Sequence, residues 1–290
     1  MTSHHPSAQR GAGAGPSGRE IFSEGRLAEQ QGRFADARRS YEKALAAGPV
    51  CADWLYRLGC VCLKLADPVS AENSFRRALE LEPASAVILT NLGVSLDRQG
   101  RREEAVRFYR RSQQHGGTAV AHHNLGSIHA EEGRTDEAVR AFEAAIALAP
   151  DAEAYLNLGL VHVARGDYVA ALESFEHSVS CDETFALGHY HAALCLMKIG
   201  RYADACLGFE RAWARDGRLA RVPFHVGACL HKLERYEEAR QQLEHALEFF
   251  PDDGRIHYQL ALTCDALGLP QEARRPYGRA RALNAENRTA

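Results

Sequence analysis

The sequence predicts an all-α solenoid, in which one helix-turn-helix unit is copied eight times and stacked. Three observations predict it. Alanine recurs every 33 or 34 residues, a small residue stands twelve positions before each alanine, and a bulky residue stands four positions after it. A repeat of this length is one supersecondary unit that can bury its apolar face only against its neighbours, so the chain should be a row of stacked units.

These three columns explain how the two helices of a unit pack. The alanines are Ala37, Ala71, Ala105, Ala138, Ala171, Ala205, Ala239 and Ala273. The small column is Gly25, Gly59, Gly93, Gly126, Gly159, Ala193, Gly227 and Ala261, and the bulky column is Tyr41, Phe75, Tyr109, Phe142, Phe175, Phe209, Leu243 and Tyr277. Small residues let two helices approach near the lower end of the roughly 8–10 Å interaxial range, and the bulky side chain fills the remaining gap.

Turn and stop signals separate the predicted helices. Most units place a glycine five residues before the alanine, which suits a helix C-terminus that enters a tight turn. These glycines are Gly32, Gly100, Gly133, Gly166, Gly200 and Gly268, while Glu234 takes this place in the seventh unit. Proline closes several units, at Pro49, Pro83, Pro150 and Pro251. Pro276 falls inside the last predicted helix and should bend or fray it.

The columns resemble the tetratricopeptide repeat, a helix-turn-helix of 34 residues with small residues at its eighth, twentieth and twenty-seventh positions. The resemblance covers residues 18–285 and implies a right-handed superhelix of eight repeats. Their expected bounds are about 18–51, 52–85, 86–118, 119–151, 152–185, 186–219, 220–253 and 254–285. Residues 1–17 are small, polar and glycine-rich, which predicts a disordered tail, and residues 286–290 are expected to form a short C-terminal tail.

Composition argues against several classes of function. The net charge of −3 gives no electrostatic case for nucleic-acid binding. No apolar run approaches the roughly 18 residues of a membrane span, and the N-terminus lacks a signal core, so we expect a cytoplasmic protein without membrane insertion. The sequence contains no phosphate-binding glycine loop and no protease or hydrolase motif. We therefore expect no enzyme activity and no cofactor.

Two histidine–cysteine pairs are the best candidates for metal ligands. His191 with Cys195 and His225 with Cys229 each stand four residues apart on a predicted helix. Stacked repeats should hold the pairs about 10 Å apart, whereas the ligands of one zinc ion lie roughly 4 Å from each other. The sequence therefore predicts no metal site, and these cysteines are expected in the core.

The resemblance also implies which residues would meet a ligand, because the first helix of each tetratricopeptide unit lines a concave groove. Asn91, Asn124 and Asn157 occupy the sixth position of three consecutive units. A carboxamide offers one acceptor and two donors, so it can bind both the N–H and the C=O of an extended peptide. This is similar to the asparagine ladder of the O-linked N-acetylglucosamine transferases. The alternative is that asparagine is only tolerated here on an exposed helix face.

Neighbouring groove positions are aromatic or apolar and could anchor a partner's apolar segment. The predicted anchors are Tyr56, Leu156, Leu160, Tyr190, Leu194, Phe224 and Tyr258. The alternative is that some of them pack against the helix of the next unit. The fifth position holds no lysine, which argues against the clamp that co-chaperones use for acidic chaperone tails. Basic residues could still lend positive charge to parts of the groove, namely Lys64, Arg98, Lys198, Lys232, Arg221 and Arg255.

The predicted function is a non-enzymatic scaffold that binds an extended peptide or an apolar protein segment in its concave groove. Two alternatives stay open. One is a self-assembling structural protein, and the other is an accessory subunit that presents substrates to a separate enzyme such as a glycosyltransferase. The last unit has no further helix to cover its face, so this end is expected to associate with a second copy or with another protein.

Overall fold

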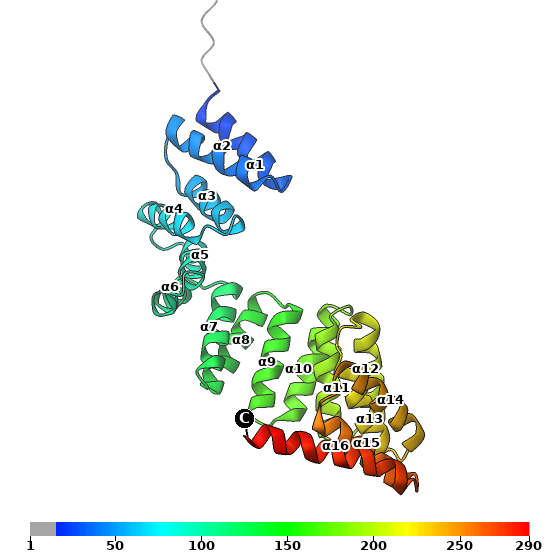
Figure 1. Cartoon of the computed structure of the whole chain (residues 1–290). Helices are drawn as coiled ribbons and strands as arrows, with labels where there is room; N and C mark the ends of the chain where they lie inside the picture. Colours follow the sequence, from blue (N-terminus) through cyan, green and yellow to red (C-terminus); the bar gives the residue numbers. More distant parts are fainter. Residues whose placement is uncertain (1–15, 290) are drawn as a thin grey trace, which may run out of the picture. The chain divides into compact units, whose positions relative to one another are not determined.

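The structure, a computed structural model, describes residues 16–289, with side chains up to Ala285. This described part consists of sixteen α-helices joined by short turns and contains no strand (Figure 1). The all-α repeat class is therefore confirmed, while a right-handed superhelical path over the whole chain stays a prediction. The N-terminal tail expected at residues 1–17 lies outside the described residues, apart from Pro16 and Ser17.

The chain divides into two compact units after His122. The first contains α1 (Gly18–Gln30), α2 (Phe34–Ala47), α3 (Ala52–Lys64), α4 (Pro68–Leu81), α5 (Ala86–Asp97) and α6 (Arg102–Gln114). The division falls within α7 (Ala119–Glu131). The second contains α8 (Thr135–Leu148), α9 (Ala152–Ala164), α10 (Tyr168–Cys181), α11 (Ala186–Lys198), α12 (Tyr202–Arg215), α13 (Val222–Lys232), α14 (Tyr236–Phe249), α15 (Gly254–Ala266) and α16 (Pro270–Thr289).

Consecutive helices pair as hairpins, and the predicted columns form the contact inside each hairpin. Ala37, its counterparts in the column and the rings that follow them are almost all inaccessible to solvent. A methyl group added at Gly59 would lie 2.5 Å from the Phe75 ring, and one at Gly93 would lie 2.5 Å from the Tyr109 ring. Real contacts of that length are repulsive, so only glycine lets these helices approach as they do.

Caps and turns fix where the helices start and stop. Ser17 caps α1 in a capping box with Glu20, and aspartates such as Asp67 accept a hydrogen bond from the first turn of the following helix. The predicted turn glycines have positive φ angles between 72° and 84°. Ala66 and Glu234 adopt the same left-handed conformation, with φ of 57° and 59°, although a side chain is strained there.

The odd-numbered helices begin at the residues expected to open each repeat, except for α13. That helix begins at Val222 instead of Ala220, and Pro223 stands in its first turn, where a missing N–H costs no hydrogen bond.

The last helix is longer than expected. It continues through Pro276 and includes residues 286–289, where we expected a tail. Buried Ala273, Ala280 and Leu283 lie on both sides of the proline along α16. Packing of these residues on α15 explains why the helix does not end at Pro276, because tertiary contacts offset the lost hydrogen bond.

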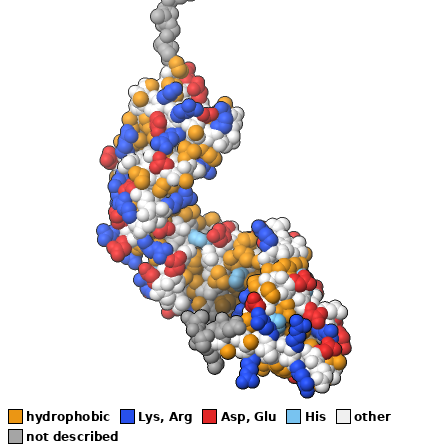
Figure 2. Space-filling model, in the orientation of Figure 1, with side chains coloured by type: hydrophobic (Ala, Val, Ile, Leu, Met, Phe, Trp, Pro, Cys, Tyr) orange, Lys and Arg blue, Asp and Glu red, His pale blue; other side chains and the backbone are white. Residues whose placement is uncertain are grey.

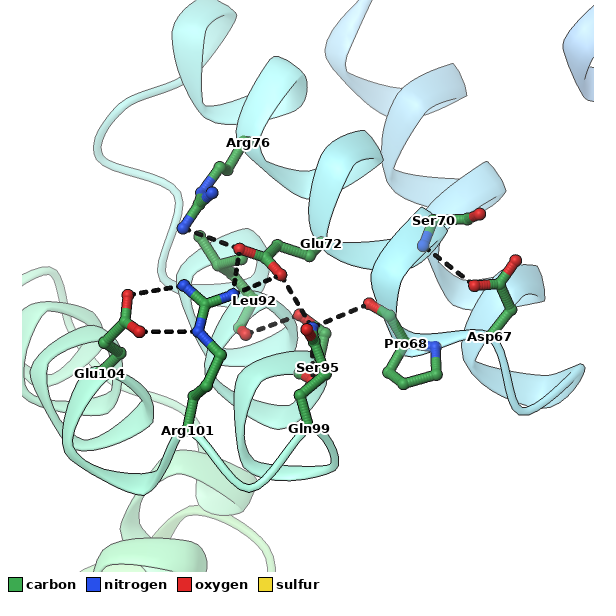
Figure 3. A network of polar contacts seen from close by, with 10 residues as sticks. All are labelled: Asp67, Pro68, Ser70, Glu72, Arg76, Leu92, Ser95, Gln99, Arg101 and Glu104. Carbon is green, nitrogen blue, oxygen red and sulfur yellow. Dashed lines mark hydrogen bonds and ion pairs between the residues drawn. The ribbon is translucent and has the colours of Figure 1, made fainter.

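A buried ion network links two repeats of the first unit (Figure 3). Glu72 of α4 is only 4% exposed. Its carboxylate accepts hydrogen bonds from Arg101 at 2.8 Å and from Gln99 at 2.8 Å, and it pairs with Arg76 at 2.7 Å. Arg101 also pairs with Glu104, at 2.6 Å. Because Gln99 and Arg101 lie in the turn between α5 and α6, the network joins one hairpin to the next.

Candidate binding surface

The first helices of the hairpins in the second unit lie side by side and form one continuous surface. The Asn157 amide on α9 lies 3.3 Å from Nε2 of His123 on α7. Helix α9 contacts α11, and α13 contacts α15. The Tyr190 hydroxyl on α11 lies 3.1 Å from Nε2 of His225 on α13. We call the surface of α9, α11, α13, α15 and of α7 from His123 onward the first-helix face.

One end of the first-helix face is hollowed, and both apolar and polar side chains line the hollow. A hollow of about 290 Å³ lies between α7, α8 and α9 and brings together two predicted site residues, Asn157 and Leu160. Ser127, Thr135 and Ala164 also line it. The Leu160 side chain is 37% exposed, so an apolar group meets solvent beside a carboxamide. This combination can bind a side chain and hydrogen-bond to a main chain.

Farther along the face, Tyr190 and His225 form an aromatic cluster over Phe209. The His225 ring stacks on Phe209 with centroids 5.2 Å apart and planes 11° apart, and the Tyr190 ring meets Phe209 edge-on at 5.7 Å. Burial, together with the charges of Arg221 and Arg255, lowers the pKa of His225 to about 4. The imidazole is therefore neutral at pH 7. Its Nδ1 is buried and has no hydrogen-bond partner among the described residues. Figure 2 shows apolar and histidine side chains together on the second unit.

The predicted apolar anchors differ in how much surface they offer. Tyr258 is 51% exposed and its ring lies 6.0 Å from that of Tyr277. Tyr190 and Leu194 are half-buried against one core cluster, and Phe224 is half-buried against the next. Leu156 is only 7% exposed and belongs to the core around Phe175. The sequence predicted Leu156 as a surface anchor, but this side chain packs in a core that includes Cys195 of the next repeat.

Two predicted site residues belong to the first unit. Tyr56 on α3 lies with its ring 6.0 Å from Phe75, and burial raises the pKa of its hydroxyl. Asn91 on α5 donates a hydrogen bond from its amide to the Val87 carbonyl of the same helix, at 2.9 Å. Asn124, half-buried on α7, and Asn157 belong to the second unit. The predicted ladder thus crosses the division between units, and its continuity stays a prediction.

An arginine pair at the α13 and α15 end was only partly anticipated. Arg221 and Arg255 both pair with Asp253, and the distance from Arg255 is 3.0 Å. The Arg221 guanidinium also lies over the Phe250 ring, 4.1 Å from its centroid. The sequence indicated the two charges but not their shared carboxylate. The shared carboxylate could have been found from residue positions, because Asp253 directly precedes α15 and the two arginines occupy the second repeat position in consecutive units.

The described residues hold no group of three or more histidine, cysteine or carboxylate side chains placed to bind a metal ion. The His191 ring, considered as a ligand, stacks on Phe175 at 5.3 Å. Among the described helices, none has the length and apolar character needed to cross a membrane.

Comparison with known proteins extends these observations. Of the curated proteins, Tetratricopeptide repeat protein 8 of Caenorhabditis elegans is 35% identical over 83 residues, which are 29% of this chain and 16% of that protein. The chain thus matches only a small part of that relative's length.

Several solved structures share the fold. The MamA protein aligns with 22% identity and a TM-score of 0.56, over 60% of this chain and 96% of that one. YrrB, described as a TPR protein with an unusual peptide-binding site, aligns with 23% identity and a TM-score of 0.57, over 61% and 93%. The C-terminal part of a TPR repeat-containing protein from Cytophaga hutchinsonii covers 82% of this chain and 99% of its own, with 15% identity and a TM-score of 0.63.

The family comparison covers most of the chain. The tetratricopeptide repeat matches residues 22–68, 57–119 and 123–183 in one form and residues 218–286 in another. These matches coincide with the hairpins whose glycine, alanine and ring columns form the core, and the chain belongs to the tetratricopeptide repeat family.

Proposed function

We propose that this protein holds an extended segment of a partner protein along the first-helix face of its second unit. Tetratricopeptide repeats are protein–protein interaction modules, so a scaffold role follows from the family. The observation that carries the finer proposal is the hollow where Asn157 and Leu160 meet, on a face that continues to the exposed Tyr258. YrrB, which has a similar fold, is described with a peptide-binding site and is a precedent for such binding.

The chemistry of the face suits a segment with both main-chain and apolar contacts. The Asn157 carboxamide beside His123 supplies donor and acceptor groups for a peptide backbone. Leu160 supplies apolar surface in the hollow, and Tyr258 supplies an amphipathic ring at the other end. Because the helices are already folded, binding orders only the ligand, which limits its entropic cost.

A pair of matched substitutions in one hairpin tests the proposal. A peptide selected from a random display library on the purified protein would be labelled, and its affinity measured by fluorescence anisotropy. Leu160→Asp on α9 should weaken binding by at least about tenfold, since it removes an anchor worth roughly 1.5 kcal/mol or more. Val169→Asp on α10 is the control, because Val169 is also exposed, at 59%, but on a second helix. Equal affinities for both variants would refute the proposal.

A second candidate function is self-association through the last repeat. A hollow of about 900 Å³ lies between α14, α15 and α16, and Leu247, Leu260, Pro276 and Ala282 line it. A second copy could bury this apolar surface. Light scattering over a range of protein concentrations tests the idea, and a mass that stays monomeric throughout would oppose it. A role as an accessory subunit of an enzyme differs only in what the bound partner does, and it stays open.

A further inference from the structure

We propose that the α13 and α15 end of the first-helix face selects a segment in which an acidic residue stands next to an aromatic one. This inference rests on the proposed function and specifies its ligand. The determinants are Arg221, directly before α13, and Arg255 on α15, which share Asp253, together with the aromatic side chains of Phe249 and Phe250 beside them. Both arginines occupy the second position of their repeats.

The arginine pair carries more positive charge than its shared carboxylate balances. Asp253 lies between the two guanidinium groups, and its side chain is only 11% exposed. Arg221 is 36% and Arg255 71% exposed. One carboxylate therefore serves two cations, and the more exposed one faces solvent. An incoming carboxylate can pair with Arg255 without displacing Asp253 from Arg221.

Other charged groups lie near the arginine pair, and most of the acidic ones have a partner of their own. Asp252 is matched by Arg279, at 2.5 Å. Asp265, farther along α15, accepts a hydrogen bond from the Tyr277 hydroxyl at 2.7 Å. Lys232 adds a further positive charge beside His231. The charges of Arg221 and Arg255 both lower the pKa of His225. The surroundings of the aromatic cluster are therefore electropositive, which favours an anionic partner.

A hollow beside the two arginines leaves space for a ligand side chain. Both line a hollow of about 600 Å³ with Phe249, Phe250 and Asn284. Phe249 is 42% exposed. A side chain that enters this hollow meets aromatic surface and a guanidinium group together. An acidic residue beside an aromatic one in the ligand matches that combination.

Three labelled peptides test the inference. They share the sequence Gly-Pro-X-Phe-Pro-X-Phe-Pro-Gly, with X as aspartate, asparagine or lysine, and their affinities are measured by fluorescence anisotropy. We expect the aspartate peptide to bind about tenfold more tightly than the asparagine peptide and the lysine peptide to bind most weakly. Arg255→Gln should remove most of the preference for aspartate. Arg201→Gln, which also neutralises an exposed arginine with a local aspartate partner, should keep it.

Several results would overturn the inference. Equal binding of the aspartate and asparagine peptides would do so, as would an aspartate preference that survives Arg255→Gln. Failure of all three peptides would also reject it. These failures stay distinct from failure of the proposed function, because the library-selected peptide and Leu160→Asp test that function independently of charge.

Discussion

Each unit contains a carboxylate held between two arginines, Glu72 in the first unit and Asp253 in the second. Glu72 lies between Arg76 and Arg101, while Asp253 lies between Arg221 and Arg255. In the first unit Glu104 supplies a second carboxylate to Arg101, so two anions balance two cations. In the second unit one anion serves two cations. Similar chemistry thus gives a neutral link between repeats in one place and a charged surface in the other.

Exposure follows the same division. The side chain of Glu72 is 6% exposed and its arginines are 36% and 47% exposed. Asp253, at 11%, and Arg221, at 36%, are similar, and the difference lies in Arg255, which is 71% exposed. Removing a buried carboxylate that has all its partners destabilises the stack, because Gln99 and Arg76 lose their partner and Arg101 keeps only Glu104. An exposed arginine contributes little to stability and remains available to a ligand. We therefore infer that the Glu72 network holds two repeats together and that the Asp253 network, through the exposed Arg255, is available to a ligand.

The largest expected effect comes from breaking the buried network. Glu72→Ala removes the buried partner of Gln99, Arg76 and Arg101 and should lower the free energy of unfolding by about 2 kcal/mol, because both arginines are partly exposed and Arg101 keeps Glu104. Asp253→Ala should cost about 1 kcal/mol, chiefly through the lost hydrogen bond that caps α15, because Arg255 is already solvated. Denaturant unfolding measures both. Glu80→Ala, at an exposed position of the same helix, is the control. If Glu80→Ala lowers the free energy of unfolding as much as Glu72→Ala does, the structural role of Glu72 is contradicted.

The two units also differ in how many buried histidines make their stability sensitive to acid. Most of the histidines whose pKa is lowered by burial belong to the second unit, and they are His189, His191, His225 and His231. In the first unit His122 behaves in the same way. His225 is the most shifted, with a pKa of about 4, against about 6.5 in an unfolded chain. The unfolded state therefore binds more protons below pH 6.5, and stability falls as the pH falls toward 4.

Replacing His225 should remove part of that acid sensitivity. In the wild type this side chain should account for a loss of roughly 1–2 kcal/mol between pH 7 and pH 5. His225→Gln is expected to flatten the dependence by that amount, whatever it does to stability at pH 7. Urea unfolding at pH 7, 6 and 5 provides the measurement. An unchanged slope would show that folding does not lower the pKa of His225.

The sequence predicted the hairpins because their packing depends on residue size at fixed intervals. A Cβ at Gly159 would lie 2.5 Å from the Phe175 ring, so small residues opposite rings must recur in every unit. The binding surface was less predictable. Leu156 and Leu160 stand on the same helix, yet one is 7% and the other 37% exposed, and that difference depends on the next repeat. The bond between Arg221 and Asp253 joins residues 32 positions apart, which a repeat pattern alone does not specify.

The smallest expected effect tests the turns, and each unit offers one site. Ala66 in the first unit and Glu234 in the second occupy the turn position with φ near 60°, where a side chain costs roughly 1–2 kcal/mol. Ala66→Gly and Glu234→Gly relieve that strain but add freedom to the unfolded chain, so each should stabilise the protein by about 0.5 kcal/mol. Thermal unfolding of both variants measures the gain. If neither variant gains stability, the left-handed turns are not strained, and the six glycines at this position in other repeats need another explanation. If only one gains, the two units differ in how firmly their neighbouring helices fix the turn.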